Sequence, residues 1–227
     1  MDKAIKYKLV TCLEEYVTEN KRLLIEAALN NRTRHITVVL EDIYQSQNAS
    51  AVVRTCDCFG IQDVHVIVNN NAYVLNPRVV HGASKWVDIH QYNVEGENKS
   101  TTCINRLKEQ GYKIVATSPN RKYPSIDDVK VNNKIALFFG TERKGLQSRT
   151  MEMADELVTI PMYGFTESFN LSVSAAICLK TIVSKLHKSE IGWRLSDDER
   201  LDIKLSWYKK LVNRSELIMN EFLSKVV

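Results

Sequence analysis

The stretch "ITVVLEDIYQSQNASAVVRTCDCFGIQDVHVIV", residues 36–68, decides the fold. It begins with ITVVL (36–40) and ends with VHVIV (64–68), two β-branched apolar runs of the kind that buried strands use. Between these runs, residues 48–58 repeat apolar side chains at steps of three and four, as an amphipathic helix does. A strand, a helix and a second strand in that order predict two parallel strands joined by a crossover helix.

The same alternation continues along the chain. Further strands are expected over 112–118, 135–140 and 157–161, and further helices over 101–109, from about 148, and over 171–186. The sequence therefore predicts an α/β fold, a mostly parallel sheet with helices on both faces. Both ends of the chain have helical patterns, and in the second Ser196 and Glu199 form a capping box. We expect an N-terminal helical extension at 1–35, the α/β domain at 36–186 and a C-terminal helical extension at 187–227.

The composition is that of an ordinary globular protein, with 44% hydrophobic and 26% charged residues in a chain of 227. No apolar run approaches the length of a membrane span, and the opening MDKAIKYK has no signal-peptide core. The five cysteines include no CxxC pair, and the five histidines include no HExxH. We therefore expect reduced thiols in a cytoplasmic protein, and no metal site.

The net charge of +4 is unevenly distributed. Residues 36–184 are balanced in charge, so the basic surplus lies in the two helical ends. A basic bias on flanking helices suits a polyanionic partner such as a nucleic acid.

Glycine spacing excludes the two common nucleotide-binding loops. No GxG occurs anywhere, so the dinucleotide-binding fingerprint is missing. GTERKGL (140–146) has two glycines, but Leu146 stands where a phosphate-binding P-loop needs its lysine. Another kind of site must therefore occupy the carboxyl ends of the strands, where open α/β sheets bind their ligands.

The candidates for that site are polar or small residues that follow a predicted strand: Asn48, Arg54, Gly140, Glu142, Ser168 and Asn170. Each has a purely structural alternative. Arg54 can pair with Asp57 on a solvated helix face, and Gly140 can serve a turn. Ser168 or Asn170 can cap the helix that follows.

Taken together, these segments resemble the three ordered motifs of SpoU-type RNA ribose 2′-O-methyltransferases, in the SPOUT superfamily. The motifs are NASAVVRTCD (48–57), FFGTERKGL (138–146) and IPMYGFTESFNLSVSAA (160–176). The resemblance runs over 36–184 and extends to both helical ends. Within the superfamily the chain is most similar to tRNA enzymes that methylate guanosine 18 in the D-loop.

The resemblance implies a C-terminal segment threaded into a trefoil knot, an obligate homodimer, and S-adenosylmethionine as methyl donor. Carried over position by position, the donor-binding residues are Thr117, Gly140, Ile160, Met162, Phe169 and Leu171. The implied catalytic set is Arg54, Asn48, Glu142, Ser168 and Asn170. Without the resemblance, the apolar members of the first set would equally be core residues. The predicted helix 171–186 is rich in small residues and suits packing against a second subunit.

One segment departs from the family pattern. Where the tRNA enzymes usually have Lys-Pro-His-Asn before the helix, this chain has Gln45-Ser46-Gln47-Asn48. The asparagine remains, but a positive charge and a ring are missing. The departure concerns contacts to RNA near this turn more than it concerns the chemistry.

Arg54 has two alternative roles in the implied methyl transfer. As a base it would have to be neutral, and a guanidinium with a pKa above about 12 is neutral at pH 7 at a cost of roughly 7 kcal/mol. General-base help contributes about 3–5 kcal/mol, which is less than that cost. We therefore expect a charged Arg54 that grips the substrate phosphate and stabilises the developing alkoxide, while the proton leaves through phosphate or water. Asn48, Ser168 and Asn170 would orient Arg54 and the ribose, and Glu142 would hold its own loop or the arginine.

The residues expected to contact RNA are basic residues of the two ends: Arg32, Arg34, Arg194, Lys209, Lys210 and Arg214. Each can equally belong to a solvated helix face.

Two other functions stay open. One is methylation of 23S ribosomal RNA, although such enzymes usually carry an N-terminal RNA-binding domain of roughly a hundred residues, and only about 35 residues precede the first strand here. The other is a catalytically silent RNA-binding dimer on the same scaffold, which the presence of all five catalytic candidates disfavours.

Overall fold

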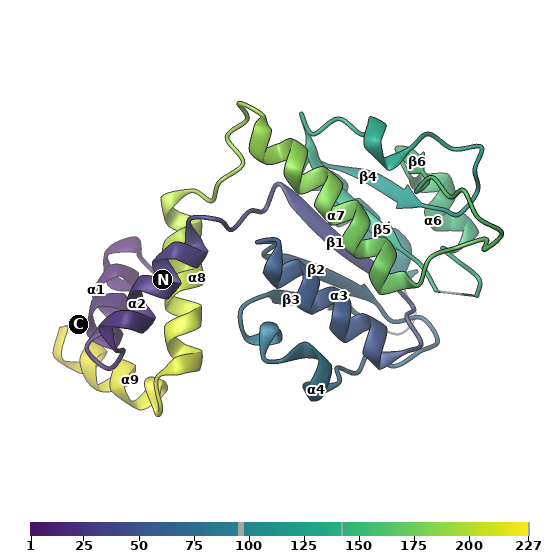
Figure 1. Cartoon of the computed structure of the whole chain (residues 1–227). Coiled ribbons are helices and arrows are strands. Elements are labelled where there is room, and N and C mark those ends of the chain that lie inside the picture. The colour runs from purple at the N-terminus through teal and green to yellow at the C-terminus, as the bar shows by residue number, and fades with distance from the viewer. Residues whose placement is uncertain (95–97, 142, 227) are drawn as a thin grey trace. The chain divides into compact units, whose positions relative to one another are not determined.

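The computed structural model describes residues 1–94, 98–141 and 143–226. These residues form two units, drawn in Figure 1. The first is a helical unit made of Met1–Arg32 and Arg194–Val227, and the second is an α/β unit made of Thr33–Trp193.

The α/β unit is built on a six-stranded parallel sheet with the strand order β3-β2-β1-β5-β4-β6. The strands are β1 (Ile36–Glu41), β2 (Asp63–Ile67), β3 (Asp88–Tyr92), β4 (Tyr112–Thr117), β5 (Lys134–Phe139) and β6 (Glu156–Val158). In the middle of the sheet, β1 and β5 pair with Ile36 opposite Ile135 and Leu40 opposite Phe139. Their nearly continuous apolar sequences suit strands that are buried on both faces.

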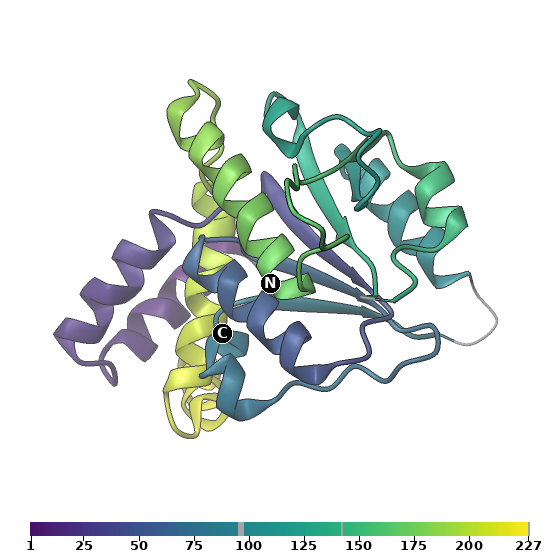
Figure 2. The ribbon, with the colours of Figure 1, turned by 45° about the vertical axis from the view of Figure 1, so that its right-hand side comes forward.

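Helices cover both faces of this sheet (Figure 2). One face packs against α3 (Ser46–Cys58), α4 (Pro77–Val80) and α7 (Leu171–Lys188), and the other against α5 (Lys99–Glu109) and α6 (Ser148–Met153). Two short 3₁₀ turns, η1 (Ala83–Lys85) and η2 (Ile126–Asp128), complete the unit. The predicted α/β fold with a parallel sheet between helices is confirmed.

The helical unit contains α1 (Lys3–Glu14), α2 (Glu19–Leu29), α8 (Asp197–Leu211) and α9 (Ser215–Val226). α1 packs against α8 and α9, and α2 packs against α8, so both ends of the chain share this unit. The helical pattern at 3–29 is divided into two helices, because Thr18 takes extended backbone at the N-cap of α2. The capping box of α8 is confirmed, with the Ser196 N–H donating to Glu199 Oε2 at 2.8 Å and the Glu199 N–H donating to Ser196 Oγ at 3.3 Å.

Two strands differ from the prediction. β3 was not predicted, because its sequence DIHQY alternates little and the strand lies half-buried at the edge of the sheet. β6 is shorter than the expected 157–161, because the chain leaves the sheet after Val158 to form a loop at its carboxyl end. Among the residues that the structure describes, no helix has the length and apolar character of a membrane span.

Candidate active site

A cavity, which we call the donor cavity, lies at the carboxyl ends of β4, β5 and β6. Thr117, Phe139 and Val158, the last residues of these three strands, all line it. The turn after β5 and the loop between β6 and α7 supply the rest of the wall. Open parallel sheets bind their ligands at this edge, because the loops there leave the strands and can close around a molecule.

All six residues expected to bind the methyl donor line this one cavity. They are Thr117, Gly140, Ile160, Met162, Phe169 and Leu171, and Ser168 of the catalytic set joins them. The six come from three segments that are far apart in the sequence. The fold thus brings these six residues and Ser168 together around one cavity.

The turn after β5 is tightly closed. The Thr141 N–H donates to the Gly145 carbonyl at 3.1 Å, and the Gly145 N–H donates back to the Thr141 carbonyl at 2.9 Å. Gly145 has a φ of +68°, which glycine adopts without strain. At Gly140, a Cβ would lie 2.2 Å from the Gly145 carbonyl carbon, so a side chain cannot fit without opening the turn. Both glycines therefore serve the turn, and the turn forms a wall of the cavity.

Two of the catalytic candidates, Asn48 and Asn170, hydrogen-bond each other. Asn170 Nδ2 donates to Asn48 Oδ1 at 3.2 Å, and Asn48 Nδ2 donates to Gln45 Oε1 at 2.9 Å. Asn170 also caps α7, since its Oδ1 accepts the Ser172 N–H at 2.8 Å. The capping alternative is therefore correct for Asn170, but the same side chain also joins the start of α7 to the start of α3.

Arg54 lies exposed on α3. Within the described part of the chain its side chain has no hydrogen bond or ion pair, so the pairing with Asp57 that would make it a solvated face residue is not observed. Arg54 does not line the donor cavity. Glu142, the remaining catalytic candidate, lies outside the described residues.

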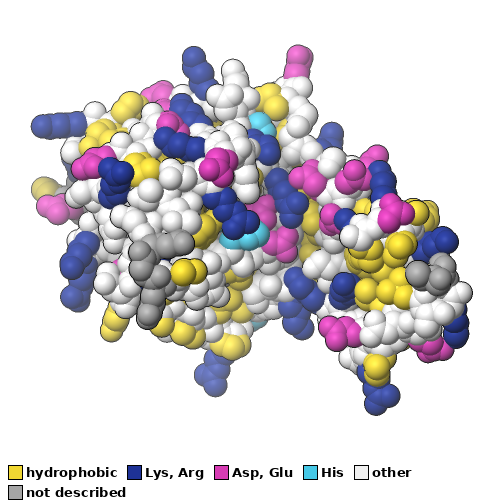
Figure 3. All heavy atoms as spheres, turned by 180° about the vertical axis from the view of Figure 1, so that it is seen from behind, with side chains coloured by type: hydrophobic (Ala, Val, Ile, Leu, Met, Phe, Trp, Pro, Cys, Tyr) yellow, Lys and Arg dark blue, Asp and Glu magenta, His cyan; other side chains and the backbone are white. Residues whose placement is uncertain are grey.

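Two of the arginines expected to contact RNA are instead held within the protein. Arg32 is only 3% exposed, and its guanidinium lies 5.2 Å from the centre of the Trp207 ring in the helical unit. Arg34 Nε donates to Asp63 at 2.9 Å, and its Nη2 donates to Asp88 at 3.1 Å. The other four candidates, Arg194, Lys209, Lys210 and Arg214, are exposed in the helical unit. Basic and acidic side chains are interspersed on the face that Figure 3 shows, so charge alone does not select an RNA surface there.

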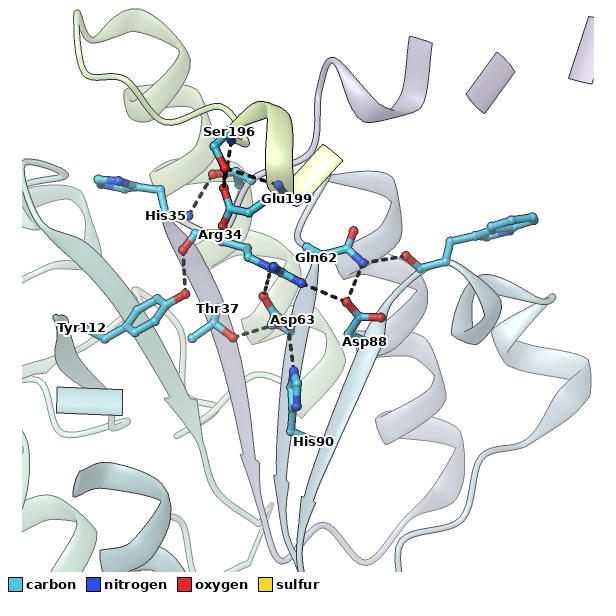
Figure 4. Close-up of polar contacts among 12 residues, drawn as sticks. Arg34, His35, Thr37, Gln62, Asp63, Asp88, His90, Tyr112, Ser196 and Glu199 are labelled. Atoms are coloured by element: carbon cyan, nitrogen blue, oxygen red, sulfur yellow. Dashed lines mark hydrogen bonds and ion pairs between the residues drawn. The ribbon is translucent and has the colours of Figure 1, made fainter. Parts of the chain in front are cut away.

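Arg34 belongs to a polar cluster at the amino ends of β1, β2 and β3, shown in Figure 4. His90 Nε2 lies 2.8 Å from Asp63 Oδ1, and Gln62 Nε2 donates to Asp88 at 3.1 Å. Burial alone would raise the pKa of Asp63, but the hydrogen bond from His90 and the charge of Arg34 outweigh burial and lower it. The cluster lies at the amino ends of the strands, whereas the donor cavity lies at their carboxyl ends. Its charged side chains are paired with one another.

A second cavity, whose residues were not predicted from the sequence, lies at the carboxyl ends of the strands. Tyr44, Asn70, Asn71, Arg143 and Lys144 line it. Two signals were present in the sequence: three asparagines directly after the strand VHVIV, and two adjacent basic residues inside GTERKGL. No group of three or more His, Cys, Asp or Glu within the described ranges is placed to hold a metal ion.

Comparisons with known proteins agree with this arrangement. The SpoU rRNA Methylase family matches residues 35–180. The chain is 43% identical to a tRNA (guanosine(18)-2′-O)-methyltransferase of Borreliella burgdorferi, over 94% of this chain and 95% of that protein. Among solved structures, the A. aeolicus TrmH/SpoU tRNA modifying enzyme superposes with a TM-score of 0.76 at 27% identity, covering 86% of this chain and 98% of that one. The methyltransferase AviRb of Streptomyces viridochromogenes, solved with AdoMet, has the same fold with a TM-score of 0.60 at 20% identity over 72% of this chain and 65% of that one.

Proposed function

The chain belongs to the SpoU methylase family, and we propose that it transfers a methyl group from S-adenosylmethionine to the ribose 2′-hydroxyl of guanosine 18 in tRNA. The observation that carries the proposal is the donor cavity, where all six expected donor-binding residues meet. The name of the B. burgdorferi relative supports the substrate. The likeness to that protein covers nearly the whole of both chains and so includes the helical ends.

The donor cavity has the chemistry that S-adenosylmethionine requires. Ile160, Met162, Phe169 and Leu171 offer apolar surface for an adenine ring, and the chain at Gly140 and Thr141 offers backbone groups for its polar edge. Ser168 and Thr117 add hydroxyl groups at the wall. Bound there, S-adenosylmethionine supplies a methyl group activated by its positively charged sulfur.

In the proposed reaction, the ribose 2′-oxygen forms a bond to the methyl carbon while the bond from that carbon to sulfur breaks. Charged Arg54 holds a phosphate of the RNA and stabilises the developing negative charge on oxygen, and the proton passes to phosphate or water. Asn48 and Asn170, joined by their hydrogen bond, position the ribose near Ser168. Glu142 is proposed to hold its own loop or the arginine. Arg54 and Ser168 are the members of this set whose side chains are exposed and, among the described residues, without a partner.

We extend the proposal to a homodimer whose subunits meet near the donor cavity. Tyr163 and Phe165, in the loop before α7, are fully exposed, and Phe169 and Val173 are 42% and 44% exposed. Apolar side chains gathered in this way favour burial against another protein surface. We also propose that the segment from β5 to α7 is knotted, as in the family, and that the protein acts in the cytoplasm, where its tRNA substrate is found.

The proposed surface for the body of the tRNA is the helical unit. Arg194, Lys209, Lys210 and Arg214 are exposed there and can bind phosphates. Arg32 and Arg34 are left out of this surface, because one is buried against Trp207 and the other is bound by two carboxylates.

The test is transfer of labelled methyl groups from S-adenosylmethionine to bulk tRNA, followed by mapping of the modified ribose. Label on guanosine 18 is the expected result. Label on ribosomal RNA alone would contradict the substrate and favour the 23S alternative. Absence of heat on titration with S-adenosylmethionine, together with retained tRNA binding, would favour a catalytically silent RNA-binding dimer.

A further inference from the structure

The second cavity opens where β1 and β5 end, next to the donor cavity. Thr141 and Gly145 line both cavities, so a single turn separates them. β1 and β5 are neighbours in the sheet, but the chain leads from β1 to α3 on one face and from β5 to α6 on the other. Neighbouring parallel strands whose connections diverge leave a crevice, and ligands of open α/β sheets bind in it.

One wall of this cavity is a loop held by Asp42. The Asp42 carboxylate accepts the backbone N–H groups of Asn69, Asn70 and Asn71 at 3.2, 2.6 and 2.8 Å. Asp42 itself has a φ of 57°, a left-handed conformation that is uncommon outside glycine but that aspartate adopts more readily than most residues. Burial alone would raise the pKa of Asp42, but these hydrogen bonds outweigh burial and lower it. The loop is therefore fixed in place by an ionised carboxylate.

The same contacts orient two side-chain amides. Asn70 Nδ2 donates to Asp42 Oδ2 at 3.0 Å, and Asn71 Nδ2 donates to the Asp42 carbonyl at 2.8 Å. Among the described residues, neither amide oxygen accepts a hydrogen bond. Both asparagines line the cavity, which thus has two neighbouring acceptors available to a ligand. A planar ligand with two adjacent N–H donors matches that pair.

Among the described residues that line the cavity, the charged side chains that a ligand can reach are basic. Glu41 is 1% exposed and is bound by Ser100, Thr150 and the Gln147 N–H. Among the described residues of the wall, both acidic side chains, Glu41 and Asp42, are thus engaged within the protein. Arg143 and Lys144 are exposed and have no ion pair among the described residues. The remaining charge therefore favours an anion such as an RNA phosphate.

An aromatic ring and a chain of hydrogen bonds complete the cavity. Tyr44 is 76% exposed and lines it. Single-stranded RNA is recognised by stacking of unpaired bases on such rings. Gln45, also in the wall, accepts a hydrogen bond from Asn48, which in turn accepts one from Asn170. The wall is thus connected to the residues proposed to position the ribose.

We propose that this second cavity binds the guanine base of the nucleotide that is methylated, with the ring stacked on Tyr44 and a phosphate near Arg143 and Lys144. The 2-amino group donates to the side-chain oxygen of Asn70, and N1–H donates to that of Asn71. The inference rests on the proposed function and adds the residues that select the base. Guanine carries two adjacent donors on that edge, whereas adenine carries none at the same two positions.

The stacking contact is tested with Tyr44→Ala and Tyr44→Phe, measuring kcat and KM for a tRNA transcript and the Kd for S-adenosylmethionine. We expect Tyr44→Ala to raise the KM for tRNA about tenfold with an unchanged Kd for the donor. Tyr44→Phe keeps the ring and is expected to restore most of that loss. An unchanged KM in a folded Tyr44→Ala protein would overturn the stacking role.

The base contact is tested with transcripts that carry guanosine or inosine at the methylated position, because inosine lacks only the 2-amino group. We expect the wild-type protein to use the inosine transcript about tenfold less well, and Asn70→Ala to lose most of this discrimination. Asn70→Ala keeps all three backbone N–H groups that bind Asp42, so the loop should stay folded. The matched control is Asn133→Ala, an exposed asparagine just before β5 at the opposite edge of the sheet, which should keep the full discrimination.

The outcomes separate this inference from the proposed function. Methylation of tRNA by the wild-type protein, with discrimination unchanged in Asn70→Ala, would overturn the base-binding role alone. Methyl transfer to no tRNA at all would overturn both, because the inference depends on the function.

Discussion

The two edges of the parallel sheet use the same residue types in opposite ways. At the amino edge, Arg34 is bound by Asp63 and Asp88, and His90 shares Asp63 with it. At the carboxyl edge, Arg143 and Lys144 line a cavity and, among the described residues, have no ion pair. Charges paired within the fold contribute to stability, and charges left without a partner beside a cavity are available to a ligand. Whether a charged residue is paired within the fold therefore distinguishes a structural role from a ligand-binding role better than its residue type does.

The largest expected effect comes from Arg54, on the helix that follows the carboxyl edge. Arg54→Ala should lower kcat about 10³-fold, because charge stabilisation in the transition state is lost. The melting temperature of the Arg54→Ala variant should equal that of the wild type, since the Arg54 side chain has no partner among the described residues. Single-turnover methylation and thermal unfolding measure the two quantities.

Arg54→Lys distinguishes the two roles of this residue. A lysine can lose its proton more easily than arginine, but it lacks the planar fork that binds a phosphate through two N–H groups. We therefore expect Arg54→Lys to be nearly as inactive as Arg54→Ala. Turnover close to that of the wild type would contradict the phosphate-binding role and support a base.

The next largest effect is expected at Gly140, inside the turn that separates the two cavities. Gly140→Ala places a Cβ 2.2 Å from the Gly145 carbonyl carbon, so the turn must open. We expect a loss of about 3 kcal/mol in unfolding free energy and loss of heat on titration with S-adenosylmethionine. Gly192→Ala is the matched control, because a Cβ there meets no atom within 4 Å. Equal behaviour of the two variants would refute the steric argument.

A smaller effect, on stability alone, is expected at the amino edge. Asp63→Asn removes the carboxylate that Arg34 and His90 share, which should lower the unfolding free energy by about 2 kcal/mol. The kcat of the folded protein should not change, because this edge is far from the donor cavity. Urea denaturation measures the stability, with the exposed Asp128→Asn as control. A fall in kcat would show that the polar cluster at the amino ends of the strands affects the chemistry at their carboxyl ends.

The smallest expected effect is a pH dependence of the stability, caused by His65 of β2, beside the polar cluster at the amino ends of the strands. Burial, together with the positive charge of His90, lowers the pKa of His65 to about 4, although Asp63 acts in the opposite direction. The unfolded chain, with a histidine pKa near 6.5, binds the proton more readily, so stability falls as the pH falls from that value towards 4. Between pH 7 and 5.5 this amounts to about 1 kcal/mol.

His65→Gln should reduce this pH dependence by that amount. Denaturation curves at the two pH values measure it, and a variant with the same pH dependence as the wild type would exclude His65 as its source.

The sequence predicted the central strands well because their signal is local. β1 and β5 are continuous apolar runs, which only a strand buried on both faces requires. β3 has no such run, since it is an edge strand with half-buried Ile89 and His90, and only pairing with β2 defines it. A contact with a distant strand cannot be read from five residues.

The residues of the candidate site also fall into two groups: those recognisable from a local motif and those whose role depends on distant contacts. Of the six residues expected to bind the donor, five belong to two recognisable motifs and Thr117 lies at the end of a predicted strand, so all six could be named from the sequence. Arg34 was predicted to contact RNA because it is basic, but its two partners lie 29 and 54 residues further along the chain. Tyr44 was missed for the opposite reason, since an exposed aromatic residue in a loop has no pattern until the cavity beside it is seen.

The central pairing of β1 with β5 also matters while the protein is being made. About 100 residues separate Ile36 from its partner Ile135, so β1 leaves the ribosome long before the strand that covers its second edge. At a synthesis rate of about 5–20 residues per second, that edge stays open for roughly 5–20 s. During this interval the nascent chain exposes an apolar strand that can pair with the wrong partner, which is the period in which a chaperone would help it most.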